Sequence, residues 1–220
     1  MDGMHLGRET WAEALAQQTM HWSELASGIR KHCSNQLSSA EVGELSDRLS
    51  GMKHFLDSIE NKIKEDLASE DCVMVKSILE GPSLGQAFHF KEHSLAVFVM
   101  MHAGLALVVD RMVHVLSQRA MMTPASRPWT TPNPQLLIRI FRTYEYAWKL
   151  RPMGSTFIHL PLIVAYPHAS TEKMRAWILQ AMNDLNKHRL SGGEGFTDKS
   201  LMYLAMSFTG EAAPIVQEMA

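Results

Sequence analysis

Four polar residues stand where a helical chain could do acid–base chemistry. Asp110 and His114 are four positions apart, so on one helix the carboxylate could orient the imidazole as a general base. His102 lies two turns before Asp110, about 80° round the same helix. We predict that His102, Asp110 and His159 are catalytic. The structural alternative for Asp110 and His114 is a surface contact near the polar end of the helix.

Aromatic side chains gather after residue 142 and could line a cavity. Tyr144 and Trp148 share one helical face, and such side chains supply contact area with a polar tip. Pro161 predicts a kink that would open space beside His159. The alternative is that residues 142–151 maintain the fold, with Arg142 and Glu145 paired at i, i+3. The predicted substrate-binding residues are His114, Tyr146, Trp148, Met153 and Trp177.

One segment could hold a metal. It reads His89-Phe90-Lys91-Glu92-His93 and matches the H-x-x-E-H pattern of zinc peptidases. On a helix the two histidines would share a face. A catalytic zinc needs a third ligand, and nothing downstream supplies an obvious one. We therefore predict no metal, and interpret the pair as surface histidines at the start of a helix.

Several cofactor signatures are absent from the sequence. Ser191-Gly-Gly-Glu-Gly is not a phosphate loop, because no strand precedes it and no G-K-S/T follows. There is no dinucleotide fingerprint. We predict no cofactor, and nucleotide-dependent and redox classes lose support.

Composition indicates one globular domain spanning residues 1–220. The chain is 46% hydrophobic and 20% charged, and a chain of this length buries roughly 70% of its unfolded surface. The 21 basic residues are scattered among 23 acidic ones, which argues against direct binding of nucleic acid. Sixteen methionines suit either core filling or a pliable pocket for an apolar ligand.

The location is predicted from the cysteines and the first residues. Two cysteines make no disulfide framework, and the start lacks the pattern of a signal peptide. We predict a cytoplasmic protein, or a nuclear one if it is regulatory.

The first 68 residues predict a helical hairpin. Thr10 with Glu13 and Ser38 with Glu41 are capping boxes, and Asp66 ends the second helix. That helix carries apolar residues at alternating steps of three and four, a seam that packs at a shallow angle. The seam could pair with the first helix, or it could face a second subunit and form a homodimer. Its residues are Val42, Leu45, Leu49, Met52, Leu56, Ile59 and Ile63.

The rest of the chain also predicts helices, so the fold class is all-α. We expect a single bundle of about seven to eight helices, with the hairpin at 8–68 and a helical core at 70–210. The apolar run 95–109 is shorter than the ~20 residues that cross a bilayer, so it reads as buried core, and the tail after Gly210 is expected to be loose. Helices are expected over 71–79, 92–120, 135–150, the segment around Pro161, the segment from Ser170, and 198–208.

Segments between Ile138 and Trp177 carry a resemblance to a known family. They read I-R-I-F-R-T-Y-E-Y, R-P-M-G-S, L-P-L-I-V-A-Y and M-R-A-W-I-L. This stretch resembles the C-terminal helical region of fungal zinc-cluster transcription factors, which implies an all-helical regulatory or ligand-sensing bundle. The six-cysteine DNA-binding module of that family is absent, since the chain has two cysteines. The resemblance implies an effector region without DNA-binding activity.

Three hypotheses follow. The first is a stand-alone small-molecule-binding scaffold, a cofactor-independent cyclase or isomerase of an apolar precursor in fungal secondary metabolism. Its chemistry would rest on holding the substrate in a reactive geometry. The second is a truncated regulator that senses a ligand or dimerises, and the third is a structural unit without a ligand.

Overall fold

A computed structural model describes residues 8–82, 85–118, 129, 133–151, 155–187 and 195–211. Over these residues the chain is all-α apart from one short hairpin. The N-terminal elements are α1 (Arg8–Met20), α2 (Trp22–Cys33), α3 (Ser39–Ala68), β1 (Cys72–Lys76), β2 (Gln86–Phe90) and α4 (His93–Ser117). The C-terminal elements are α5 (Pro134–Lys149), the 3-10 turn η2 (Thr156–Ile158), α6 (His159–Ala165), the 3-10 turn η3 (Tyr166–His168), α7 (Glu172–Asn186) and α8 (Asp198–Phe208).

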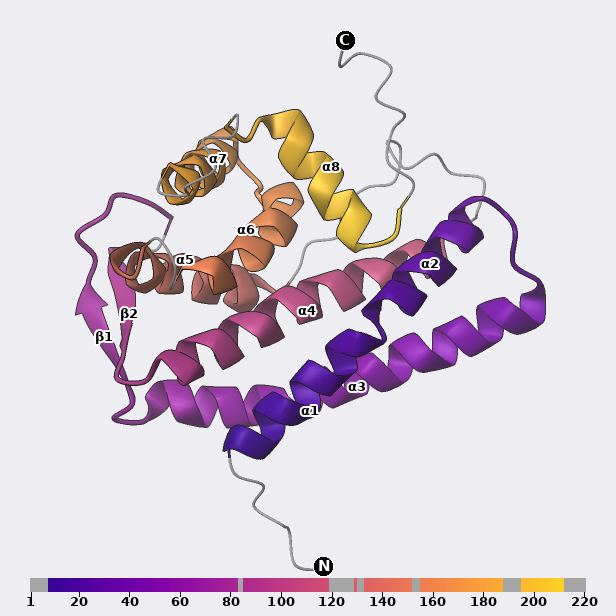
Figure 1. Cartoon of the computed structure of the whole chain (residues 1–220), viewed down its shortest axis with the longest axis horizontal. Helices are drawn as coiled ribbons and strands as arrows, with labels where there is room; N and C mark the ends of the chain where they lie inside the picture. The colour runs from indigo at the N-terminus through magenta and orange to yellow at the C-terminus, as the bar shows by residue number, and fades with distance from the viewer. Residues whose placement is uncertain are drawn as a thin grey trace, which may run out of the picture.

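Helix α4 is the central layer of the bundle. It lies between α1–α3 on one side and α5, α6 and α8 on the other (Figure 1). The helix is long and apolar enough to cross a membrane by length and composition alone, yet 72% of its most apolar window is buried inside the bundle. The prediction of a buried core helix is confirmed over this stretch.

The predicted seam of α3 is buried within the chain. The capping box at Ser38 and Glu41 is present as predicted, with reciprocal hydrogen bonds. The side chains of six seam residues pack into the core beside α4, and Val42 is half-buried. A second subunit therefore cannot use this seam without opening the bundle. The buried six are Leu45, Leu49, Met52, Leu56, Ile59 and Ile63.

The first predicted helix is two helices. Helix α1 already begins at Arg8, so Thr10 lies inside it and the prediction of a capping box at the helix start was wrong. The chain turns at His21 and continues as α2. Beyond the turn, the Trp22 Nε1 donates a hydrogen bond to the carbonyl of Phe208 at 2.7 Å, and the two rings pack edge to face. This contact joins α2 to the end of α8.

The predicted helix at 71–79 is instead an antiparallel hairpin. Strand β1 pairs with β2 in the register Cys72 opposite Phe90 and Lys76 opposite Gln86. The physical reason is that β-branched Val73 and Val75 favour a pleated strand, while Phe88 of β2 is buried on the core side. Five-residue strands leave too little period-two signal to outweigh a helical reading.

Two C-terminal helices begin at side-chain caps. Asn133 caps α5, which has Pro134 at its start, and Thr171 accepts the amide of Met174 at the start of α7. Pro161 lies in the first turn of α6, directly after η2, where a missing amide breaks no intrahelical bond. The kink expected there stays a prediction. Ser155 makes no side-chain capping bond to η2.

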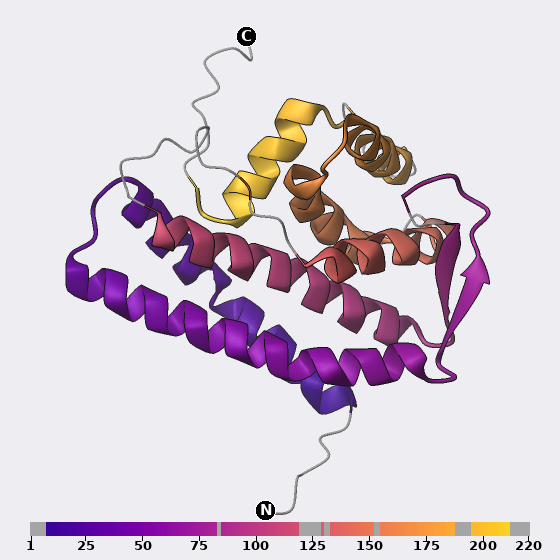
Figure 2. The same ribbon diagram turned by 180° about the vertical axis from the view of Figure 1, so that it is seen from behind.

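Figure 2 shows the same layers from behind, with the hairpin at one end of α3 and α4.

Candidate functional site

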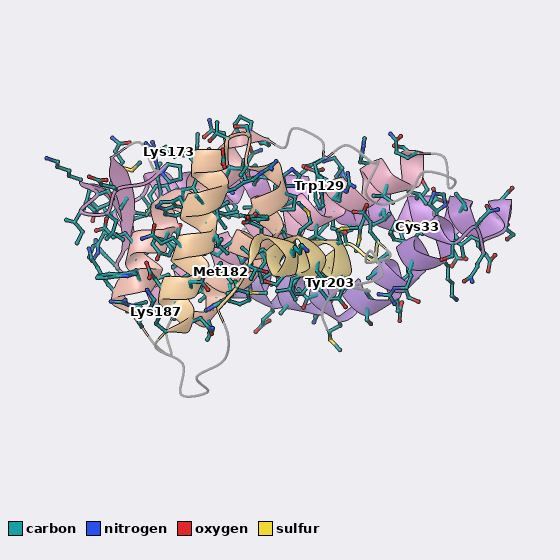
Figure 3. The ribbon with its side chains drawn as sticks, turned by 90° about the horizontal axis from the view of Figure 1, so that it is seen from above. Cys33, Trp129, Lys173, Met182, Lys187 and Tyr203 are labelled. Atoms are coloured by element: carbon teal, nitrogen blue, oxygen red, sulfur yellow. The ribbon has the colours of Figure 1, made fainter. Side chains whose placement is uncertain are left out.

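A groove of about 670 Å³ lies between α5, α7 and the loop that follows β1. Figure 3 looks onto α7, with Lys173 in its first turn and Lys187 after its last residue. The lining combines aromatic and apolar side chains with a few polar groups, the composition typical of ligand sites. It comprises Leu79, Glu80, Gly81, Pro82, Tyr144, Trp148, Thr171, Lys173, Met174, Ala176, Trp177, Gln180, Ala181 and Asp184.

The aromatic wall is fixed by edge-to-face packing. The ring of Trp177 meets Tyr144 at 5.0 Å and Phe141 at 5.4 Å between centroids. Its Nε1 donates to the carbonyl of Glu80 at 3.0 Å. A Cβ added at Gly81 would come within 2.5 Å of that Nε1, so glycine is required for the loop to approach the indole this closely.

Glu145 of α5 holds the loop at the rim of the groove through hydrogen bonds. One carboxylate oxygen accepts the hydroxyl of Ser77 at 2.8 Å and the amide of Ile78 at 2.9 Å. The other accepts the ammonium of Lys149 at 2.8 Å. Burial acts to raise the pKa of Glu145, but these hydrogen bonds outweigh it and lower the pKa. The predicted pairing of Glu145 with Arg142 was wrong.

The phenol of Tyr144 stays protonated at neutral pH. Burial raises its pKa, and the negative charge of Asp184 adds to the rise. The hydroxyl lies 3.5 Å from the carbonyl of Ala181, a long contact that leaves it able to donate to a closer acceptor.

Charges of both signs surround the groove. Lys173 and Glu80 are exposed in the lining. Asp184 accepts a hydrogen bond from Lys187 at 2.7 Å. The guanidinium of Arg151 covers the ring of Trp148 at 3.7 Å from its centroid. The charges nearly balance, so the walls select by apolar area more than by net charge.

Two of the predicted substrate-binding residues, Trp148 and Trp177, line this groove. Tyr146 does not, because its ring packs against Phe90 at 5.2 Å and His93 at 6.4 Å. His114 is absent from the lining and is half-buried. Met153 falls outside the described residues.

The predicted catalytic residues are not gathered at the groove. His102 is buried, and its Nε2 lies 2.9 Å from the carbonyl of Leu56. Asp110 binds the ammonium of Lys53 at 2.5 Å. His159 has its Nδ1 3.2 Å from the carbonyl of Thr156. None of the three is in the groove lining, so they do not form one site there.

His102 belongs to a buried polar cluster of α3, α4 and α5. Arg139 donates to the two oxygens of Glu60 at 2.9 and 3.1 Å, and its Nη1 lies 3.5 Å from His102 Nδ1. Burial lowers the pKa of His102, and the guanidinium of Arg139 acts in the same direction. A neutral imidazole can donate from Nε2 to the carbonyl of Leu56 and accept at Nδ1 from Arg139. These contacts give His102 a structural role.

The H-x-x-E-H pattern does not form a shared helical face. His89 lies in β2 and His93 is the first residue of α4, and both rings pack against Tyr146. Within the described ranges, no three His, Cys, Asp or Glu side chains are grouped to hold a metal.

Sequence reasoning missed a fully buried ion pair. Arg111 of α4 binds Glu211 through Nε at 2.8 Å and Nη2 at 2.7 Å. Both side chains have 0% exposure, and Trp129 lies 4.1 Å from the guanidinium. The tail was expected to be loose after Gly210, whereas Glu211 is held in the core.

Tyr144 and Met174 also line the groove, although neither was among the predicted substrate-binding residues. The loop at 79–82 completes the groove from a distant part of the chain, and no local pattern signals that.

Comparison of the chain with protein-family models, curated proteins and solved structures gives no match.

Proposed function

We propose that this protein binds a small molecule with a flat, apolar body in the groove between α5, α7 and the loop after β1. The observation that carries the proposal is the aromatic wall of Tyr144, Trp148 and Trp177, set beside Met174. Rigid rings offer contact area at a small entropy cost, while the thioether of Met174 adapts to the shape of a guest.

The dimensions of the groove support this proposal. A volume of about 670 Å³ falls within the range of roughly 300–1,000 Å³ that ligand sites occupy. Tyr144 can donate a hydrogen bond, and Thr171 and Gln180 add polar groups at the rim. A ligand with a flat apolar body and one acceptor matches these walls.

Ligand sensing is favoured over catalysis as the use of this site. His102, Asp110 and His159 each serve contacts away from the groove. The cyclase or isomerase activity, the setting in fungal secondary metabolism and the resemblance to zinc-cluster transcription factors remain predictions. They would place the same groove in a biosynthetic enzyme or in a ligand-sensing regulator.

The test is titration with Nile red, a neutral apolar dye, followed by its fluorescence. Ala176 is exposed on the groove lining, so Ala176→Phe places a ring in the space. We expect the dye to bind the native protein and to bind this variant at least about tenfold more weakly, since a filled pocket excludes its guest.

The matched control is Ala16→Phe, which makes the same change at an exposed position of α1. It should bind the dye as the native protein does, and both variants should keep the native melting temperature. Equal binding by Ala176→Phe and the native protein, or no saturable binding to the native protein, would refute the groove as the site.

A further inference from the structure

The outer edge of the hairpin is apolar and exposed. Val73 is 47% exposed, Met74 44% and Ile78 71%. Strand β1 lies at the outside of the two-stranded sheet in both ribbon views (Figures 1 and 2). Exposed apolar edge strands are templates for pairing with another strand.

The hydrogen bonds of the hairpin define which backbone groups face outward. The amide of Lys91 donates to the carbonyl of Asp71, and the amide of Ser77 donates to Gly85, both at 2.9 Å. Odd-numbered residues of β1 therefore face β2, and in an antiparallel pair the even-numbered ones direct their backbone to the other side. Among the described residues, the amides of Met74 and Lys76 have no partner on that outer side.

We propose that a second copy of this chain docks on that edge, strand β1 against strand β1, across a two-fold axis at Met74. The interface joins the two hairpins into a four-stranded antiparallel sheet. Each Met74 amide donates to the carbonyl of Met74 of the partner subunit. Val73 then lies opposite Val75 of the partner subunit, a non-hydrogen-bonded pair whose side chains are closest together.

Hydrogen bonding and charge select this register. Outward-facing residues must pair with outward-facing residues, which allows an axis at any residue from Cys72 to Lys76. An axis at Val75 or Lys76 would bring the two Lys76 ammonium groups together, diagonal or opposite to each other, which is unfavourable. An axis at Cys72 or Val73 would place beside it the amide of Cys72, which already donates to the carbonyl of Ser69 at 3.3 Å.

An axis at Met74 creates two opposite-charge contacts. With the axis at Met74, the numbers of two opposite residues sum to 148. Lys76 therefore lies opposite Cys72 of the partner subunit and diagonal to Glu70 of the partner subunit. The symmetry repeats that contact. Lys76 is exposed, and the Glu70 side chain is 97% exposed, 3.8 Å from Lys91. This charge complementarity identifies the occupant as a second copy, because one surface carries both halves of each pair.

The interface is small, so the dimer is weak and depends on concentration. Five paired residues a side bury less than the ~1,000 Å² of a stable interface. Both β1 edges are used in the dimer, so pairing through this edge closes at two chains.

Sedimentation velocity over a hundredfold range of protein concentration tests the charge pairing. Lys76→Glu sets like charges against Glu70 and should weaken association roughly tenfold. The swap Glu70→Lys with Lys76→Glu restores opposite charges and should recover native association. Lys199→Glu, an exposed change on α8, should have no effect. A native protein that stays monomeric throughout, or a swap no better than the single variant, would overturn the proposal.

Cross-linking tests the axis itself. Met74→Cys puts two thiols across the axis, at the ~5.5 Å Cα separation of a hydrogen-bonded pair, so diamide should yield a covalent dimer on a non-reducing gel. Met20→Cys, at a methionine that is 77% exposed on α1, is the matched control and should stay monomeric. Equal cross-linking of the two variants would refute pairing at Met74.

Met74→Pro removes the outward amide, which an edge strand tolerates. If its circular dichroism spectrum shows that it folds as the native protein does, this variant should be monomeric. Native-like association of the folded variant would show that β1 is not the interface.

Discussion

The buried ion pair of Arg111 is expected to have a large effect on the stability of this protein. Its guanidinium is fully buried and bound by both oxygens of Glu211. Charges removed from water must be compensated by close partners, so deleting one partner destabilises a protein far more than deleting an exposed pair. Thr209 adds a hydrogen bond to the same carboxylate at 3.1 Å.

We predict that Glu211→Ala lowers the free energy of unfolding by about 3–5 kcal/mol, because the cation stays buried without this carboxylate. Urea denaturation measures the change. The control is Glu24→Ala, which removes an exposed partner of Arg48 and should change stability by less than about 1 kcal/mol. Similar losses for the two variants would contradict the role assigned to burial.

Two residues predicted from the sequence to bind substrate, Trp148 and Trp177, line the groove, and their contact with a ligand stays a prediction. Large aromatic side chains stand out locally in a sequence. Arg111 and Glu211 lie 100 positions apart, and neither the pair nor the placement of His102 beside Arg139 has a local signature. Three-dimensional packing determines those partners.

At the scale of elements, two glycines with left-handed backbone show the difference between strain and steric contact. Gly85 has φ +73° in the hairpin connection, and Gly210 has φ +78° after α8. A Cβ at Gly85 would meet nothing within 4 Å, whereas one at Gly210 would overlap the backbone of Ala26 in α2. Gly210 therefore sets how closely the end of α8 approaches α2.

We predict that Gly85→Ala costs about 1–2 kcal/mol, the strain of a left-handed residue with a Cβ. Gly210→Ala has the same strain plus the overlap with Ala26, so its loss should exceed that of Gly85→Ala by at least about 1 kcal/mol. Thermal unfolding of the two variants gives the comparison. Equal melting temperatures would mean that α8 can shift away from α2 without loss.

Element boundaries could be predicted where a cap and a long period coincide. Ser38 caps the helix expected to follow it, α5 and α7 begin close to the expected positions 135 and 170, and α8 has the expected bounds. The hairpin could not be predicted in this way, because its strands are short and gain stability from Phe88 and Phe90 packed in the core. Tertiary contacts there outweigh local preference.

At the scale of the whole molecule, the cluster of His102 makes stability depend on pH. Leu56 and Glu60 face it from α3 and Arg139 from α5, with Asp57 adding a more distant negative charge. The pKa of His102 is lowered from 6.5, so the unfolded chain takes up the proton first. Stability is therefore present above about pH 6.5 and is lost as the pH falls through that value.

We predict that the native protein loses up to about 1.4 kcal/mol per pH unit from this residue below pH 6.5, and that His102→Gln lacks this slope. Urea denaturation at pH 7.0 and 5.5 measures it. The lowered pKa of Glu60 acts only below its unfolded value of 4.5, outside this window. The exposed His54→Gln on α3 is the control and should retain the native slope. An unchanged slope in His102→Gln would contradict the prediction.

Helical periodicity predicted the fold class, but it did not predict the groove. Period and caps predict helices and their buried faces, so the bundle was expected. The groove depends on which helices become neighbours, and on a loop at 79–82 that Glu145 and Trp177 fix from distant positions. His102 lies among residues of three helices, away from the groove.

The position of Glu211 also has a consequence for synthesis on the ribosome. Arg111 is made 100 residues before its carboxylate partner, which at cellular rates is a delay of about 5–20 s. During that interval α4 holds a cation that the dry interior cannot accept. A nascent chain must therefore keep this layer open to water or to a chaperone until Glu211 has been synthesised.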